Sequence, residues 1–435
     1  MCPRLSGRPR APRRPVPRRT APSVSAAPPG APPPRAEPGR PPRGTPPVPA
    51  DRPAPARGPR RRTRRRQRPR HRYATAAVAA ALAALMTVAL GACGYGSRAE
   101  AGGVAKVRPH GERTGGLEEI RLGYFANVTH ATALVGDREG FFQKELGGTR
   151  VTSQVFGAGP SAVEALNAGS VDIAWLGPSP AVNGYTRSGG RNLRIISGSA
   201  SGGVSLVAHP GRVSGLGDLR GKRIATPQLG NTQDVALLNY LTRKGYRVDP
   251  DSGEGEVTVV RIDTKETPAF FRRGDVDAAW VPEPTASQLA ARGGRVLLDE
   301  RELWEDGRHA ITTMVVSQRF LTEHPEAVEA ALRGSVRTNA WIRSHPEEAK
   351  AALNTALERQ GGQALPPAVL DPAFEHIEVL DDPLAATLVR QAGHAVRAGL
   401  LEKPELRGLC DLRLLNKVLA ERGARKVSAA GLGTG

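Results

Sequence analysis

Several short polar segments in this sequence have the composition of an anion-binding site built from uncharged donors. Ser, Thr and Asn supply hydroxyl and amide donors, and the first backbone N–H groups of a helix add further donors and a positive partial charge. Most of these segments follow an apolar run that predicts a strand and precede a run that predicts a helix. They are "NVTH" (Asn127–His130), "GPSP" (Gly177–Pro180), "SAS" (Ser199–Ser201), "LGNTQD" (Leu229–Asp234), "PEP" (Pro282–Pro284) and the pair Thr312 and Thr313.

The shared position of these segments predicts one small-anion site. In open α/β sheets, ligands bind outside the carboxyl ends of the strands. A single segment is weak evidence, because Ser, Thr and Asn also act as ordinary helix caps. Trp280 and Glu283 add a different chemistry, since an aromatic face and a carboxylate can hold a ligand ammonium. A solvent-facing acid beside a core Trp is the alternative interpretation of that pair.

Motifs of common enzyme classes are missing from the sequence. It contains no G-x-x-x-x-G-K-[ST], no G-x-G-x-x-G and no G-x-S-x-G. Its nine His residues show no metal-ligand spacing with Cys or carboxylates. Cys410 has no candidate base beside it and is expected in the core. We therefore expect no catalytic residue, no metal and no cofactor.

A seven-residue pattern occurs twice and predicts a duplicated unit. G-x-V-D-x-A-W runs from Gly169 to Trp175 and again from Gly274 to Trp280. Around both copies, apolar strand patterns alternate with helical patterns, which favours parallel α/β sheets. We predict one helix–turn–strand unit in each of two similar lobes, with the Gly ending the helix, the Asp opening a tight turn and the Trp near the carboxyl end of the strand.

The formal charge of +20 is concentrated at the N-terminal end. Residues 1–92 contain 21 Arg and only two acidic residues, Glu37 and Asp51, and the 41 basic and 40 acidic residues beyond leave the body near neutrality. A nearly neutral body exerts little long-range attraction on phosphate polymers, so we expect no nucleic-acid partner.

The first 117 residues have the pattern of an exported lipoprotein. Residues 1–73 are Pro- and Arg-rich and are expected to be disordered, and residues 74–92 form the apolar part of a signal peptide. "LGAC" (Leu90–Cys93) resembles the bacterial lipobox, in which Cys93 is lipidated. Residues 93–117 then form a tether. Residues 1–47 are alternatively an upstream over-reading of the gene, with Val48 as the true start.

Long segments of the sequence resemble the substrate-binding proteins of ABC importers for aliphatic sulfonates, taurine and nitrate. The similarity runs from about Ile120 to Arg422 and is carried by "IRLGYFANVTHATALVGDREGFF", "GAGPSAVEALNAGSVDIAWLGPSPAVNGY", "DLRGKRIATPQLGNTQDVALLNYL", "DAAWVPEP" and "ITTMVVSQRFLTEHPE". The resemblance implies a type II periplasmic-binding fold, with two α/β lobes around a ligand cleft and two hinge crossings. We expect lobe 1 to contain residues 118–208 and 314–435 and lobe 2 to contain residues 209–313, with crossings near His209 and Thr313.

The resemblance also implies which residues contact the ligand. Those expected are Tyr124, Asn127, Thr129, His130, Gly177, Pro178, Ser179, Ser199, Ser201, Gly230, Asn231, Thr232, Gln233, Trp280, Glu283, Thr312 and Thr313. Neutral donors suit a sulfonate, and Glu283 would suit the amine of taurine. His130 is the only nearby basic candidate, which weakens a nitrate interpretation.

The partners implied are a small organic anion, a membrane permease with its ATPase subunits, and the membrane itself through the lipid anchor, which places the protein outside the cytoplasm. Three alternatives stay open: a binder of nitrate or another small molecule, an enzyme of the same fold such as a pyrimidine-precursor synthase or a desulfinase, and a sensor that presents bound ligand to a receptor.

Overall fold

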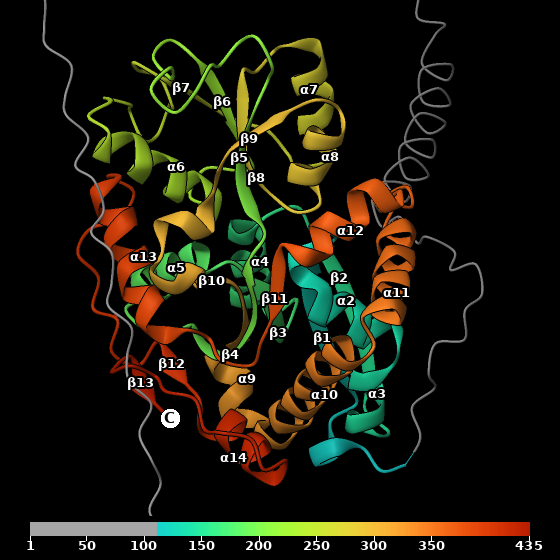
Figure 1. Ribbon diagram of the computed structural model, residues 1–435. Helices are drawn as coiled ribbons and strands as arrows, with labels where there is room; N and C mark the ends of the chain where they lie inside the picture. Colours follow the sequence, from blue (N-terminus) through green and yellow to red (C-terminus); the bar gives the residue numbers. More distant parts are fainter. Residues whose placement is uncertain (1–110) are drawn as a thin grey trace, which may run out of the picture. The chain divides into compact units, whose positions relative to one another are not determined.

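The computed structural model describes residues 111–435 (Figure 1). The predicted leader, the apolar signal segment, Cys93 and the first part of the tether lie outside the described residues. Within them, the strands form two separate sheets, so the type II periplasmic-binding architecture expected from the sequence is confirmed.

We call the part built on the larger sheet lobe 1. Its strands are β1 (Glu119–Phe125), β2 (Arg150–Phe156), β3 (Ile173–Leu176), β4 (Leu193–Gly202), β10 (Ala310–Ser317), β11 (Ile377–Val379), β12 (Cys410–Asp411) and β13 (Gly433–Thr434). Its helices are η1 (Thr114–Gly116), η2 (Val128–His130), α2 (Ala131–Arg138), α3 (Phe141–Leu146), α4 (Gly159–Asn167), α5 (Pro178–Arg187), α9 (Gln318–Glu323), α10 (Pro325–Ser344), α11 (Pro346–Arg359), α12 (Pro367–Glu375), α13 (Ala385–Arg397) and α14 (Arg413–Glu421).

Lobe 2 is built on the five-stranded sheet. Its strands are β5 (Val204–Ala208), β6 (Arg223–Thr226), β7 (Thr258–Arg261), β8 (Ala278–Pro282) and β9 (Arg295–Asp299), and its helices are α6 (Thr232–Arg243), α7 (Thr267–Arg273) and α8 (Thr285–Ala291). In Figure 1, α7 and α8 lie on one side of this sheet and α6 on the other. The short helices η3 (Glu300–Leu303) and η4 (Glu305–Gly307) lead from β9 back to lobe 1.

The two sheets share one strand plan. Lobe 1 contains the order β2-β1-β3-β10-β4, and lobe 2 has the order β7-β6-β8-β5-β9. In both, the first three strands are parallel and the fourth runs antiparallel to the third. The repeated sequence therefore supplies the central strand of each sheet, β3 and β8, so the motif lies in equivalent places.

The Asp of each repeat fastens its strand to the neighbouring one. Asp172 Oδ2 accepts a hydrogen bond from the Arg121 N–H at 2.8 Å, and the Asp172 N–H donates to Arg121 O at 2.8 Å. Asp277 makes the same two bonds with the backbone of Arg223, both at 2.8 Å. These paired bonds set the register at which the central strand enters the sheet.

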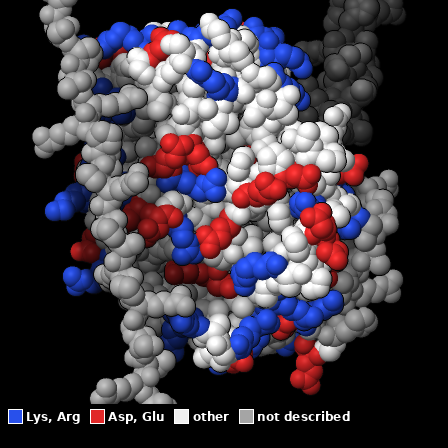
Figure 2. Space-filling view, in the orientation of Figure 1, with Lys and Arg blue, Asp and Glu red and all other residues white. Residues whose placement is uncertain are grey.

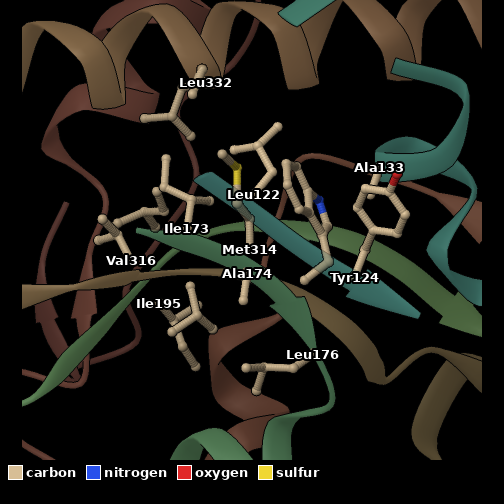
Figure 3. Packing of buried hydrophobic residues seen from close by; sticks show 14 of the residues in the cluster. Leu122, Tyr124, Ala133, Ile173, Ala174, Leu176, Ile195, Met314, Val316 and Leu332 are labelled. Atoms are coloured by element: carbon tan, nitrogen blue, oxygen red, sulfur yellow. The ribbon is translucent and has the colours of Figure 1, made fainter. Parts of the chain in front are cut away.

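Both repeat tryptophans are core residues. Trp175 and Trp280 are fully buried, Trp175 against Phe142 and Trp280 against Tyr240. Figure 3 shows how lobe 1 is filled: Leu332 of α10 lies on the side of the sheet that carries Ile173, while Leu176 and Ile195 lie on the opposite side. Apolar residues thus cover both faces of the sheet, as is usual when parallel strands are enclosed by helices.

The chain crosses between lobes earlier than expected at both places. The first crossing lies at Gly202–Gly203, where β4 ends and β5 begins, and not near His209. Both glycines have a left-handed backbone, with φ of 75° and 71°, which allows the chain to turn from one sheet into the other. The second crossing lies between Asp299 and Ala310, because β10 belongs wholly to lobe 1.

The end of the predicted tether is packed on lobe 1. The Thr114 N–H donates to Thr149 Oγ1 at 2.9 Å, and Thr114 Oγ1 donates to Leu146 O at 2.9 Å.

On the face shown in Figure 2, basic and acidic side chains are interspersed, which fits the nearly neutral composition of the body. None of the helices within residues 111–435 is long and apolar enough to cross a membrane.

Candidate ligand cleft between the lobes

A cleft lies where the strand ends of the two lobes face each other. Its lining includes eight of the residues expected from the sequence: Asn127, Thr129, His130, Gly177, Asn231, Thr232, Gln233 and Thr312. The enclosed space is about 20 Å³, little more than the ~10–15 Å³ that one water molecule requires. The lobes are therefore closed on each other in this structure.

Backbone and side chain bonds cross the cleft. The Gly159 N–H of lobe 1 donates to Asn231 Oδ1 of lobe 2, and the Ser179 N–H of lobe 1 donates to Thr232 Oγ1 of lobe 2, both at 3.4 Å. These bonds are long, and therefore weak. A ligand with several acceptor oxygens could take both donors with better geometry.

Three helices begin at the cleft. α4 and α5 of lobe 1 and α6 of lobe 2 start at Gly159, Pro178 and Thr232. None of their N-cap residues bonds its side chain to the first turn of its own helix. The first-turn N–H groups and the positive ends of three helix dipoles are thus directed toward the same small volume, an arrangement that favours an anion.

Gly177 allows the two lobes to approach closely at this point. A Cβ atom at this position would lie 2.3 Å from Thr232 Oγ1. Any larger residue would therefore force the Thr232 hydroxyl, which lies at the start of α6, to move.

His130 acts in the cleft as a neutral donor. It is 2% exposed, and burial lowers its pKa to about 3, so the imidazole is uncharged near neutral pH. The Phe125 N–H donates to His130 Nδ1 at 3.2 Å, and the Phe125 ring stacks on the imidazole. Because Nδ1 accepts, the proton of the neutral ring sits on Nε2.

Thr312 presents a hydroxyl that the protein itself leaves unused. Its side chain is 1% exposed and lines the cleft, and Oγ1 has no hydrogen-bond partner among residues 111–435. Buried hydroxyls are rarely left unpaired. Among residues 111–435, no Lys, Arg, Asp or Glu lines this cleft, so every side-chain donor that they place in it is uncharged.

Four residues expected to contact the ligand instead use their side chains in hydrogen bonds within lobe 1. Tyr124 Oη donates to Asp137 Oδ2 at 2.6 Å, and Thr313 Oγ1 donates to Leu176 O at 3.2 Å. Ser199 Oγ donates to Thr132 Oγ1 at 3.1 Å. Ser201 Oγ accepts from the His309 N–H at 3.1 Å. These residues lie on β1, β4 and β10, but their side chains satisfy the strands and helices around them.

Pro178, Ser179 and Gly230 border the cleft without lining it. Pro178 is the first residue of α5, and Ser179 reaches the cleft only through its N–H. The Gly230 N–H donates to Asp234 Oδ2 at 3.0 Å, which shapes the turn before α6.

Trp280 and Glu283 do not form the expected ammonium site. Trp280 Nε1 donates to Glu300 Oε2 at 2.9 Å inside lobe 2. The Glu283 carboxylate is 1% exposed and accepts from the N–H and hydroxyl of Ser287 at 3.0 Å, while His376 Nδ1 lies 2.7 Å from Oε1. Its oxygens are therefore occupied by the protein, and neither residue lines the cleft.

The structure adds residues that the sequence interpretation missed. They are Phe125, Gly157, Pro227, Thr264 and Ile311, whereas Pro282 belongs to the "PEP" segment expected from the sequence. Gly157 and Pro227 directly follow the ends of β2 and β6, so the strand-end rule would have found them if it had been applied to apolar and small residues as well. Thr264 lies three residues after the end of β7, a strand end to which the rule was not applied.

The two sheets, the double crossing and the interlobe cleft define a periplasmic solute-binding fold. The sequence matches the model of the NMT1-like family over residues 114–357. Because this match covers more than half of the chain, the protein belongs to the NMT1-like family.

Relatives with known names share this fold. The chain is 30% identical over 204 residues to the taurine-binding periplasmic protein of Escherichia coli K12, covering 47% of this chain and 61% of that protein. The chain thus spans less than two thirds of the length of this relative. The alkanesulfonate-binding protein SsuA from Xanthomonas axonopodis pv. citri, solved with bound MOPS, is 25% identical with a TM-score of 0.52, covering 66% of this chain and 95% of that one. The nitrate-binding protein NrtA from Synechocystis PCC 6803 is 16% identical with a TM-score of 0.55, covering 66% and 82%, a likeness of fold alone.

Proposed function

We propose that this protein is an extracytoplasmic solute-binding protein that captures a small sulfonate-type anion, an aliphatic sulfonate or taurine, and delivers it to the membrane permease of an ABC importer. The observation that carries the proposal is the convergence of three uncapped helix starts and the unpaired Thr312 hydroxyl on one cleft without charged side chains. A sulfonate spreads one negative charge over three oxygens, so several neutral donors can each bind one of them.

The names of the taurine-binding and alkanesulfonate-binding relatives support this ligand class. In our proposal, Cys93 is lipidated and anchors the protein to the outer face of the cell membrane. Ligand binding favours the closed form, because only there do both lobes contact the anion. The permease then recognises the closed form.

A binding protein is favoured over an enzyme of the same fold by the composition of the cleft. Its lining contains no Cys, no carboxylate and no Lys, and its one His is held neutral by burial. These groups can hold an anion by hydrogen bonds, but they include no evident nucleophile with a base beside it.

Calorimetric titration and thermal unfolding with ethanesulfonate, taurine, sulfate and nitrate test the proposal. Ligand at 100 times Kd adds about 2.7 kcal/mol to the free energy of unfolding. We expect ethanesulfonate to bind at least as tightly as taurine, because no carboxylate lines the cleft to pair with the taurine ammonium. Absence of binding by both sulfonates would refute the proposal, and binding of nitrate alone would assign the cleft to nitrate.

A further inference from the structure

A second cavity, distinct from the ligand cleft, lies between α6 and α13. Its volume is about 220 Å³, and it shares no lining residue with the cleft. Tyr240 of α6 belongs to lobe 2, His394 lies on α13, and Trp304 lies on the connection that returns from lobe 2 to lobe 1. Figure 1 shows α13 beside α6, and Arg397 of α13 donates to Asn239 Oδ1 of α6 at 2.7 Å.

The inner part of this cavity is apolar and aromatic. Tyr240, Leu298 and Trp304 are 5%, 5% and 8% exposed, and Ala236 leaves space beside them. The volume of the whole cavity, mouth included, exceeds the ~150 Å³ of an engineered cavity that binds benzene, so it is large enough for one aromatic ring. The Tyr240 hydroxyl is buried and has no hydrogen-bond partner among residues 111–435, which leaves a free donor at this ring-sized space.

The mouth of the cavity is cationic. Arg243, Lys244 and Arg390 line it and are exposed, and none of the three forms an ion pair within the described part of the chain. The Arg390 guanidinium lies 4.6 Å from the centre of the Trp304 ring. His309 already stacks on the Trp304 ring, with ring centroids 4.8 Å apart. A ligand ring in the adjoining space would therefore contact the rest of Trp304 and place an acidic substituent beside these cations.

The one carboxylate in the lining opposes an anion only weakly. Glu300 is buried, its Oε2 accepts from Trp280 Nε1 at 2.9 Å, and burial raises its pKa to about 7. His394 is uncharged near neutral pH, because burial and the neighbouring Arg390, Arg397 and Arg243 lower its pKa to about 4. The fixed charges around the cavity are thus predominantly positive.

We propose that the cavity between α6 and α13 is a second binding site, for a small monocyclic aromatic acid whose ring occupies the Tyr240–Trp304 space and whose carboxylate or sulfonate meets Arg243, Lys244 and Arg390. Both lobes contribute to its walls, so its occupant contacts the two lobes at once. This proposal does not rest on which ligand the cleft binds.

Calorimetric titration of the mature protein with phenylacetate tests this proposal. We expect binding in the millimolar range or tighter, and no binding of phenethylamine, which has a similar ring and the opposite charge. Arg390→Gln should weaken phenylacetate binding by about tenfold, as expected for the loss of one charged hydrogen-bond donor. Arg187→Gln, an exposed position on α5 outside both cavities, should change nothing.

Three further variants separate the second site from the cleft. Ala236→Leu should abolish phenylacetate binding by filling the cavity, with folding checked by circular dichroism, and Tyr240→Phe should weaken it while keeping the ring. Thr312→Val, in the cleft, should leave phenylacetate binding unchanged. The proposal is overturned if phenylacetate gives no binding heat at millimolar concentration, if phenethylamine binds equally well, or if Thr312→Val abolishes the signal while Arg390→Gln does not.

Discussion

At the residue scale, the proposed site recognises an anion without using charged side chains. His130 is held neutral with its proton on Nε2, and Thr312 keeps a buried hydroxyl unpaired. Such groups are costly to bury unless something bonds to them. A bound anion would satisfy both, so the free protein already contains the donors in place and little must be reorganised on binding.

Thr312→Val should weaken ethanesulfonate binding by about tenfold, equivalent to about 1.4 kcal/mol. The substitution removes one donor and nearly conserves the volume of the side chain. Calorimetric titration measures the change. Thermal stability should hardly change or even rise, because the hydroxyl bonds to no described residue in the free protein.

Thr313→Val, the neighbouring residue on β10, is the matched control. Its hydroxyl donates to Leu176 O inside lobe 1. We expect a loss of about 1 kcal/mol of stability from the broken hydrogen bond and an unchanged affinity. A reversal of the two outcomes, with Thr313→Val losing affinity and Thr312→Val losing stability, would show that Thr312 is a packing residue only.

At the element scale, the crossing between β4 and β5 is a tightly packed turn. Gly203 has φ of 71°, and a Cβ atom there would lie 2.6 Å from Ile377 Cγ2 and 3.4 Å from Thr129 Cγ2. Gly203→Ala should therefore lower the free energy of unfolding by about 2 kcal/mol, combining backbone strain and overlap.

Urea unfolding of Gly203→Ala beside Gly211→Ala separates the two causes. Gly211 has a similar φ of 76°, but nothing lies within 4 Å of a Cβ atom there. Its substitution should cost only the backbone contribution of about 1 kcal/mol. Equal losses in the two variants would mean that packing at the crossing contributes nothing.

The crossing is also bridged by an ion pair between lobes. His376, next to β11 of lobe 1, lies 2.7 Å from Glu283 Oε1, just after β8 of lobe 2. The hydrogen bond to Glu283 raises the pKa of His376, assisted by the charge of Glu283 and Asp299 and opposed by burial and Arg301. The pair is therefore strongest when His376 is protonated.

The free energy of unfolding should consequently fall as the pH rises from 6.5 through the raised pKa of His376, because the stabilisation from this pair is fully present below the ordinary pKa and is lost above the raised one. His376→Gln keeps a hydrogen-bonding side chain without a charge and should flatten this part of the pH profile. Urea unfolding at a series of pH values provides the test, and parallel profiles for the two proteins would contradict it.

Much of this layout could be predicted from the sequence, for identifiable reasons. The G-x-V-D-x-A-W repeat marks Gly169 and Gly274, the two Asp residues and the two Trp residues. Polar residues after the apolar run of β6 mark the strand end before Asn231, and Thr312 is marked as a polar residue near the start of β10. β5 was not predicted as a separate strand, because "VSLVA" follows β4 without a loop. For this reason the first crossing was predicted near His209 and not at Gly202–Gly203. The positions of Glu283 and Ser199 depended on partners far away in sequence, His376 and Thr132, which no local pattern reveals.

At the scale of the whole molecule, the structure contains a buried acid whose deprotonation lowers the free energy of unfolding at high pH. Glu300 is 2% exposed, and burial raises its pKa from 4.5 to about 7. Because the folded protein holds this proton more tightly than the unfolded chain, the stabilisation is complete below pH 4.5 and is lost as the pH rises through about 7.

Between about pH 6 and about pH 8, this single group should lower the free energy of unfolding by about 1 kcal/mol. Glu300→Gln keeps an oxygen that can accept from Trp280 Nε1 and removes the titration. The difference in Tm between the two pH values should therefore be smaller in the variant than in the parent protein. An identical or larger difference would show that Glu300 does not titrate in this range.

A crystal structure of the mature protein with ethanesulfonate tests the central claim most directly. We expect the lobes to be closed with the sulfonate between the starts of α4, α5 and α6, and its oxygens within hydrogen-bond distance of Thr312 Oγ1 and of first-turn N–H groups from both lobes. A sulfonate bound outside this cleft, or held there by a Lys or Arg side chain, would contradict the claim that neutral donors from two lobes recognise the anion.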